Sequence, residues 1–200
     1  LDLNALTEEI ELETEIEFTS GDFLEMSIRR ERELFDKDFE IFDNIIISEG
    51  DYDYWRANAQ LGTAQSRGVY GSIGSDLGLT DYLDGKRYGA NGKIGWHPSS
   101  SLSMELGGNF RWYELKDGEF ETIIVDGSIR FTPTKKIALT TRVQFDTVSN
   151  ELGINSRLRW MMNPASDIYL VFNQGFRRFD DRFDRTLTEG VVKAGWTFRF

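Results

Sequence analysis

The chain has 200 residues, of which 34 are acidic and 23 are basic, so its formal charge is −11. This acidity argues against nucleic-acid binding, which needs a basic face, and an aromatic share of 14% is too high for a disordered chain. The lack of cysteine excludes a disulfide framework and thiolate metal sites. The longest apolar run, from Ile168 to Phe172, is too short for a transmembrane helix.

Apolar and polar residues alternate along most of the chain. Near the start, Ile10, Leu12 and Ile16 alternate with a series of glutamates. The same pattern recurs in the segments Leu102–Trp112, Ile137–Phe145, Ile154–Met162 and Val192–Phe200. A period of two predicts β-strands, and no segment has a convincing helical period.

Turn signals divide these strands into hairpins. Pro98, Pro133 and Pro164 each follow one strand-like segment and precede another, which predicts a tight turn at each proline. More polar links lie between these turns, at 34–51, 80–86, 115–119, 147–151 and 180–188. The pattern predicts about eleven antiparallel strands in an up-and-down meander, with short turns on one side and longer links on the other.

The strand length favours a membrane barrel over a soluble sandwich, which would alternate in the same way. The expected strands are about 10–13 residues long, against about 5–6 in soluble sheets, and aromatic residues gather near their ends. We therefore predict an all-β, antiparallel, up-and-down transmembrane β-barrel. Single-chain bacterial barrels have an even number of strands. An odd count and a start at Leu1 lead us to expect that residues 1–200 are the C-terminal part of one larger barrel domain.

The last strand ends in a distinctive pattern of a polar residue, a glycine and alternating aromatic residues, namely Lys193, Gly195, Trp196, Phe198 and Phe200. This ending resembles the C-terminal signal that the barrel-insertion machinery of Gram-negative bacteria recognises. The resemblance implies that machinery and outer-membrane lipid as partners, and the bacterial outer membrane as the location. It also implies that the proline turns are periplasmic.

Three stretches resemble one bacterial family. They are SGDFLEM from Ser20, RELFDKDFEIFDNIIISEGDYDYW from Arg32 and NSRLRWMMNPASDIYLVFNQGF from Asn155. Members of that family carry a domain similar to carbohydrate-binding module family nine, followed by a C-terminal region of unknown function that looks like an outer-membrane barrel. The usual Pro-Gly-Ser turn reads Pro164-Ala165-Ser166 here, and the family's loop proline before Gly50 is absent. The resemblance implies the fold, the location and a module-like domain upstream, but no activity.

Charged residues on the polar faces are the candidate functional residues. If apolar side chains face lipid, the polar ones face the lumen. Acidic candidates lie in the first strand and basic ones in later strands, namely Glu11, Glu13, Glu15, Arg142, Arg157 and Arg159. Two interpretations stay open at this point. The charges form a polarised pore with an acidic and a basic wall, or they pair across the interior and close it.

No constellation of residues indicates catalysis. His97 is the single histidine and lies beside a turn proline, so histidine-based triads and metal sites are excluded. We expect no catalytic residue, no cofactor, no metal and no nucleic-acid partner. The predicted function is a porin-like port, or a membrane anchor, for an upstream glycan-binding-like domain. The alternative is a structural or interaction subunit of an outer-membrane complex, with a closed lumen in which the charges pair.

Overall fold

The computed structural model describes residues 7–180 and 182–197, which form strands, turns and loops without any helix. The strands are β1 (Thr7–Glu17), β2 (Phe23–Phe35), β3 (Phe39–Phe42), β4 (Ile45–Ile47), β5 (Gly50–Gly62), β6 (Val69–Gly78), β7 (Lys86–Ser99), β8 (Leu102–Leu115), β9 (Gly118–Thr134), β10 (Ile137–Asp146), β11 (Glu151–Asn163), β12 (Ser166–Phe179) and β13 (Arg182–Trp196). Among these residues there is no helix long and apolar enough to cross a membrane.

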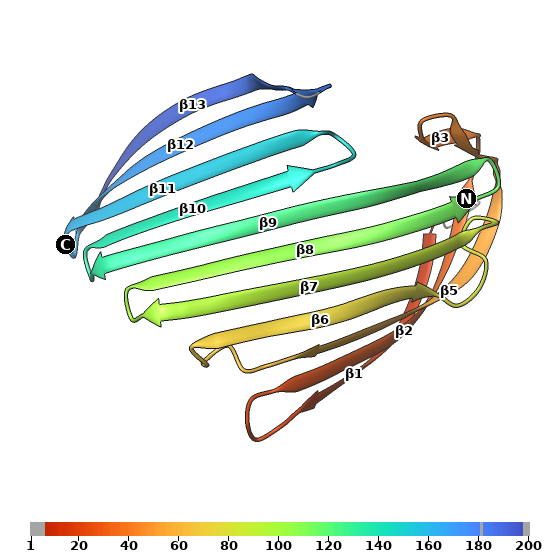
Figure 1. The fold of residues 1–200 in the computed structure, drawn as a ribbon, viewed down its shortest axis with the longest axis horizontal. Helices are drawn as coiled ribbons and strands as arrows, with labels where there is room; N and C mark the ends of the chain where they lie inside the picture. The colour runs from red at the N-terminus through yellow and green to blue at the C-terminus, as the bar shows by residue number, and fades with distance from the viewer. Residues whose placement is uncertain (1–6, 181, 198–200) are drawn as a thin grey trace. The chain divides into compact units, whose positions relative to one another are not determined.

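Eleven strands form one sheet in the order β1-β2-β5-β6-β7-β8-β9-β10-β11-β12-β13, while β3 and β4 pair only with each other (Figure 1). The order of the strands in the large sheet is therefore the same as their order along the chain, with β3 and β4 left out. The pairings from β1 to β6 and from β9 to β13 are antiparallel. The predicted all-β, antiparallel, up-and-down arrangement of about eleven strands is confirmed.

The hydrogen-bonded register explains the alternation of the sequence. Leu12 of β1 lies opposite Ile28 of β2, which lies opposite Ala57 of β5. One residue earlier in β1, Glu11 lies opposite Arg29. Residues that lie directly opposite each other in a sheet share a face. Around these positions the register collects the apolar residues on one face of the sheet, here called the apolar face, and the charged and amide residues on the other, the polar face. Farther along β2 and β5, Arg30 and Arg32 lie on the side of the apolar face and pair with Asp53 and Asp51.

Two prolines lie in strands instead of in the predicted turns. Pro98 and Pro133 belong to the last residues of β7 and β9. The residues before them, His97 and Thr132, still donate backbone hydrogen bonds to neighbouring carbonyl oxygens, at 2.7 Å in both cases. Proline removes only its own N–H from the ladder, so the strands continue past it for one more residue. The third, Pro164, lies in the turn between β11 and β12 as predicted.

The predicted difference between the two sides of the meander holds for only part of the chain. Longer links do occur at 36–49 and 79–85, but the links predicted at 115–119 and 180–188 are wrong. Only residues 116 and 117 separate β8 from β9, and β13 begins at Arg182. The charged segment after Arg182 pairs with the end of β12, with Asp184 opposite Arg177. Polar side chains do not prevent a strand when the ladder satisfies the backbone, which is why polarity alone misplaced these links.

The chain divides into two compact units, and strands β6, β7, β8 and β9 each contribute residues to both. The first unit consists of Leu1–Ala64, Ser72–Gly92 and Asn109–Thr122, and the second of Gln65–Gly71, Lys93–Gly108 and Ile123–Phe200. The first unit contains 25 of the 34 acidic residues and nine of the 23 basic ones, so its formal charge is −16 and that of the second unit is +5. The acidity of the whole chain therefore comes from the first unit.

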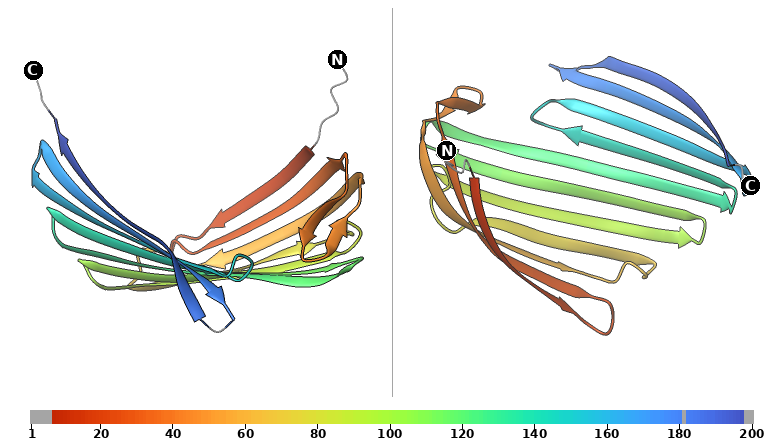
Figure 2. Two further views of the ribbon diagram at one scale, coloured as in Figure 1. Left: turned by 90° about the horizontal axis from the view of Figure 1, so that it is seen from above. Right: turned by 180° about the vertical axis from the view of Figure 1, so that it is seen from behind.

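A hydrophobic cluster within the first unit surrounds the β3–β4 hairpin, which the sequence analysis did not predict. Its buried members are Ile45, Ile47, Tyr54, Leu83 and Leu115. Figure 2 shows the two short strands of the hairpin, in brown, lying against one side of the neighbouring strands instead of extending beyond their ends. In the same cluster, burial raises the pKa of the Tyr82 hydroxyl to about 12, although the nearby Arg87 acts in the opposite direction.

Large apolar side chains outside this cluster are exposed. In the first unit Leu12 is 73% and Ile73 62% exposed, and in the second Val192 is 71% exposed. Aromatic residues near Pro98 and Pro164 are exposed as well, with Trp96 at 51% and Trp160 at 49%. Soluble monomers rarely expose such large contiguous apolar surfaces, so the apolar face requires an apolar environment.

Aromatic rings that lie directly on the backbone require glycine at two positions. A Cβ at Gly62 would overlap the ring of Phe23, which is its partner in β2. A Cβ at Gly95 would overlap the ring of Tyr70 in β6, whose hydroxyl donates a 3.0 Å hydrogen bond to Glu105. In both pairs an aromatic ring covers the glycine backbone, an arrangement that pins the register of a sheet.

The two faces differ in their tolerance of charge. Ile28→Arg places a cation on the apolar face between Leu12 and Ala57, and should cost about 2–4 kcal/mol of folding free energy in a bilayer. Ser27→Arg places the same side chain on the polar face opposite Glu13, and should cost much less. Urea unfolding in lipid vesicles measures both. Equal destabilisation by the two variants would show that the assignment of the faces is wrong.

Candidate functional site

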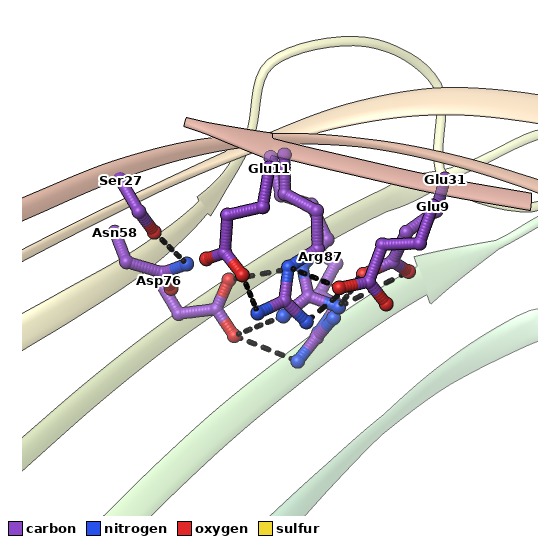
Figure 3. A network of polar contacts seen from close by, with 9 residues as sticks. Glu9, Glu11, Ser27, Glu31, Asn58, Asp76 and Arg87 are labelled. Atoms are coloured by element: carbon purple, nitrogen blue, oxygen red, sulfur yellow. Dashed lines mark hydrogen bonds and ion pairs between the residues drawn. The ribbon is translucent and has the colours of Figure 1, made fainter. Parts of the chain in front are cut away.

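The polar face of the first unit carries a continuous network of arginines and carboxylates at its centre. Arg29 of β2 and Arg56 of β5 lie directly opposite each other, and Glu31 lies between them. Arg56 donates to Glu31 at 3.0 Å and contacts Asp76 of β6 at 3.4 Å. Arg87 of β7 donates to Asp76 at 2.7 Å. Three cations from three strands thus share two carboxylates (Figure 3).

The network extends to β1 through Arg29. Its guanidinium donates to Glu11 at 2.8 Å and contacts Glu9 at 3.4 Å and Glu31 at 3.5 Å. Figure 3 shows these carboxylates around the arginine side chains. The acidic series of β1 therefore does not stand as an isolated wall. Glu9 and Glu11 pair with the strand next to β1 in the sheet, so that these two charges are neutralised between neighbouring strands.

The inner part of this network is shielded from water. The side chains of Arg56 and Arg87 are 15% and 8% exposed, and those of Glu31 and Asp76 are 10% and 16% exposed. Breaking such a pair leaves an uncompensated charge where water cannot fully replace the lost partner. We conclude that these ion pairs hold the strands of the first unit together. The buried Nε atoms of Arg29 and Arg87 have no hydrogen-bond partner among the described residues.

Glu13 and Glu15, the other two acidic candidates, have no ion pair among the interactions of the described residues. Glu13 lies opposite Ser27 and Glu15 opposite Glu25. Glu13 and Glu25 line a polar cavity of about 220 Å³ that is otherwise bordered largely by amide and hydroxyl groups, namely those of Ser27, Asn58, Gln60, Ser75 and Asn91. This cavity therefore holds two carboxylates, Glu13 and Glu25, that have no ion-pair partner among the described interactions.

The polar face of the second unit has a different character. Arg142 of β10 lies opposite Asn155 of β11, and the Asn155 amide donates to Asn173 of β12 at 2.5 Å. Asn173 in turn donates to Glu189 of β13 at 2.8 Å. Arg142, Asn155 and Asn173 line a groove of about 920 Å³ within this unit. This row of side chains, called the amide row below, presents hydrogen-bonding groups next to the Arg142 guanidinium. Among the described interactions, Arg142 has no carboxylate partner.

The remaining basic candidates surround a tyrosine. The Arg157 guanidinium lies over the ring of Tyr169, 4.6 Å from its centroid, and that of Arg159 lies 5.8 Å away. Arg159 also donates to Asp167 at 2.8 Å, and Asp167 accepts from the Tyr169 hydroxyl at 3.1 Å. Arg159 is therefore neutralised, whereas Arg157 makes a cation–π contact and keeps its positive charge.

The structure brings the six candidate charges into local groups of different kinds. Glu11 belongs to the paired network, Glu13 and Glu15 lie beside it, Arg142 lies in the amide row, and Arg157 and Arg159 surround Tyr169. Sequence analysis did not identify the most buried members of the network, which are Arg29, Glu31, Arg56, Asp76 and Arg87. The sequence does show that opposite charges lie on the same face of neighbouring strands. Which of these charges meet could be decided only from the register of the strands.

The C-terminal residues of the candidate signal lie partly within β13. Lys193 is opposite Tyr169, Gly195 is opposite Asp167, and Trp196 is opposite Ser166 and 63% exposed. Phe198 and Phe200 lie outside the described residues. Trp196 is thus exposed in the same way as Trp96 and Trp160.

His97 and the acidic residues of the loops remain to be placed. His97 stacks on the ring of Tyr70, with the two ring centroids 5.1 Å apart. The acidic residues of the described loops form no group of histidine, cysteine or carboxylate side chains that could hold a metal ion. The described part of the chain thus offers charged and amide surfaces, while the histidine serves in packing.

Comparison with known proteins gives similarity at the level of structure. No protein-family model matches the chain, and no curated protein matches it significantly. A chain of the KdgM porin is similar with a TM-score of 0.38 and 12% identity, over 96% of this chain and 97% of that chain. The KdgM porin in complex with disordered oligogalacturonate gives the same values. A NanC porin chain is similar with a TM-score of 0.39 and 13% identity, over 98% of this chain and 94% of that chain.

The shielded network can be separated from exposed ion pairs by mutation. Arg56→Ala should destabilise the protein by about 3–5 kcal/mol, because Glu31 and Asp76 lose a partner away from water. Arg177→Ala, which removes the exposed pair with Glu151, should cost less than about 1 kcal/mol. Denaturant unfolding in detergent or lipid compares them. A loss at Arg56 no larger than that at Arg177 would contradict the structural role of the network.

Proposed function

We propose that this chain forms the membrane-spanning strands of an outer-membrane β-barrel and serves as a port through that membrane. The observation that carries the proposal is the reversed distribution of side chains. Apolar residues such as Leu12 and Ile73 are exposed, while charged ones such as Arg56 and Glu31 are shielded and paired. A soluble protein buries the opposite set. Strands of 10 to 17 residues are long enough for a tilted crossing of the hydrocarbon layer.

The location in the bacterial outer membrane belongs to the same proposal. Spanning structures need every backbone group paired within the protein, which a closed antiparallel barrel achieves without helices. The aromatic residues Trp96 and Trp160 suit the interface between lipid and water, where such residues collect at both ends of a barrel. The C-terminal pattern through Trp196 supports delivery by the barrel-insertion machinery, and the family resemblance supports an upstream domain for which the barrel is the port or anchor.

A port is favoured over a closed lumen by the way the charges pair. Arg29, Arg56 and Arg87 find their carboxylates on neighbouring strands. The charges of this face therefore need no partner across the interior, and an open lumen leaves them satisfied. Glu13, Glu15, Arg142 and Arg157 keep charges that can act on a passing ion. The second candidate, a structural or interaction subunit with a closed lumen, is favoured by the β3–β4 hairpin, which lies over the same face.

Conductance in a planar bilayer tests the port. Under a salt gradient, the full-length protein should conduct, and the double variant Glu13→Gln with Glu15→Gln should shift the reversal potential towards anion selectivity, because two unpaired negative charges are removed. The matched double variant Arg142→Gln with Arg157→Gln should shift it towards cations. Conductance with no change of reversal potential in either variant would show that these residues do not line the path.

Topology is tested by labelling, for which the cysteine-free chain is well suited. Asp117 and Lys135 lie in the turns at opposite ends of β9. Cysteine at Asp117 should react with an impermeant reagent on intact cells, and cysteine at Lys135 should react only after the outer membrane is opened. The reverse result would invert the orientation. Equal reaction of both on intact cells would argue against a membrane-spanning strand between them.

A further inference from the structure

The β3–β4 hairpin covers the polar face of the first unit and not its apolar face. Ile45 and Ile47 are 5% and 3% exposed, and they pack with Tyr54, Leu83 and Leu115. Tyr54 lies opposite Glu31 in the register of β2 and β5. It therefore belongs to the same face as the arginine–carboxylate network, and so does the hairpin that covers it.

Aromatic contacts fix the hairpin at a second point. Phe42 of β3 stacks on Phe120 of β9 with ring centroids 4.5 Å apart and planes 5° apart. Phe120 stacks in turn on Tyr113 of β8 at 4.6 Å. The Arg87 guanidinium lies 5.8 Å from the centroid of the Tyr113 ring and 5.4 Å from that of Tyr82. The apolar contacts of the hairpin thus continue directly into the charged network.

Hydrogen bonds brace the hairpin and the segments beside it. The Glu49 backbone N–H donates to Asp38 at 2.8 Å, across the open end of the hairpin. The Tyr52 hydroxyl donates to the Ser48 carbonyl oxygen at 3.0 Å. At the tip, the left-handed Asn44 donates its backbone N–H to Glu40 at 2.6 Å. These bonds and the packing of Ile45 and Ile47 hold the link against the sheet, unlike a loop that extends freely into solvent.

The outer side of the hairpin differs from the side that packs. Ile46 lies between the two buried isoleucines in sequence but is 48% exposed, as the alternation of a strand requires. The acidic residues of this link are exposed too, namely Asp36, Asp38, Glu40, Asp43 and Glu49. The link therefore has an apolar inner side that docks and an acidic outer side that water can reach.

We propose that the β3–β4 hairpin is a built-in stopper that docks on the lumenal face at the end of the strands where the longer links lie, and restricts what passes the port. The inference rests on the proposed function, because a stopper needs a path to restrict. The docked position uses Ile45 and Ile47 as its anchors. Their packing against Tyr54 and Leu115 places chain over surface that would otherwise line the opening, and the outer acidic residues give that opening a negative charge.

Single-channel conductance of the full-length protein tests the stopper. The double variant Ile45→Asp with Ile47→Asp should undock the hairpin and raise the conductance several-fold, because the packing side then carries two charges. A variant with residues 37–48 replaced by a short Gly-Ser linker should do the same. The matched control Ile46→Asp changes the exposed residue of the same strand and should conduct like the unaltered protein.

The outcomes separate the two proposals. Equal, non-zero conductance in all four proteins would overturn the stopper and leave the port. Silence in all four, with heat-modifiable gel migration showing folded barrels, would overturn the port and the stopper with it. A silent unaltered protein that conducts once the hairpin is undocked would support the stopper, and would show that the docked hairpin closes the port completely.

A labelling measurement tests docking without charged substitutions. Cysteine in place of Ile47 should react far more slowly with a small thiol reagent than cysteine in place of Ile46, because only the former is buried by docking. Equally fast reaction at both positions in the folded protein would show that the hairpin does not stay docked, and would overturn the stopper independently of any conductance.

Discussion

The register of the antiparallel ladder is the constraint on which both faces of this sheet depend. A shift of one residue in any strand moves its whole apolar set to the other face. Here the register of β1, β2 and β5 keeps Leu12, Ile28 and Ala57 in one row and Glu11, Arg29 and Arg56 in the next. The closely fitted pairs of glycine and aromatic ring, such as Gly62 with Phe23, oppose a slip because only that alignment accommodates the ring.

The register also decides which charges meet. Arg56 stands between Glu31 and Asp76 because β2 and β6 flank β5. Charges shielded from water are tolerated only where partners surround them, and the sheet supplies these partners from adjacent strands. This local neutralisation does not include every charge, because Glu13 and Arg142 have no ion-pair partner among the described contacts. In the proposed port, these two groups would act on a passing solute.

The β3–β4 hairpin shows how a polar surface can hold a hydrophobic cluster. The exposed apolar face is covered by no element of the described chain, whereas the cluster around Tyr54 lies on the opposite, polar side. Packing there removes Ile45 and Ile47 from water and keeps the long link between β2 and β5 in place. The same contacts adjoin Arg87, so the hairpin and the charged network form one continuous structure within the first unit.

The sequence by itself determined the class of fold, the antiparallel order of about eleven long strands and the faces of residues within them, because alternation is a local property that survives in any register. It did not determine the ends of several strands or the two strands of the β3–β4 hairpin. Residues such as Leu12 and Glu13 reveal their opposite faces from their neighbours in the chain alone. Only the tertiary structure decided which charges pair, since Arg29, Arg56 and Arg87 belong to three strands whose alignment cannot be read from one segment. It also decided the hairpin. Ile45, Ile46 and Ile47 form a short apolar run whose burial depends on Leu83 and Leu115, residues far along the chain that come into contact only when the sheet has formed.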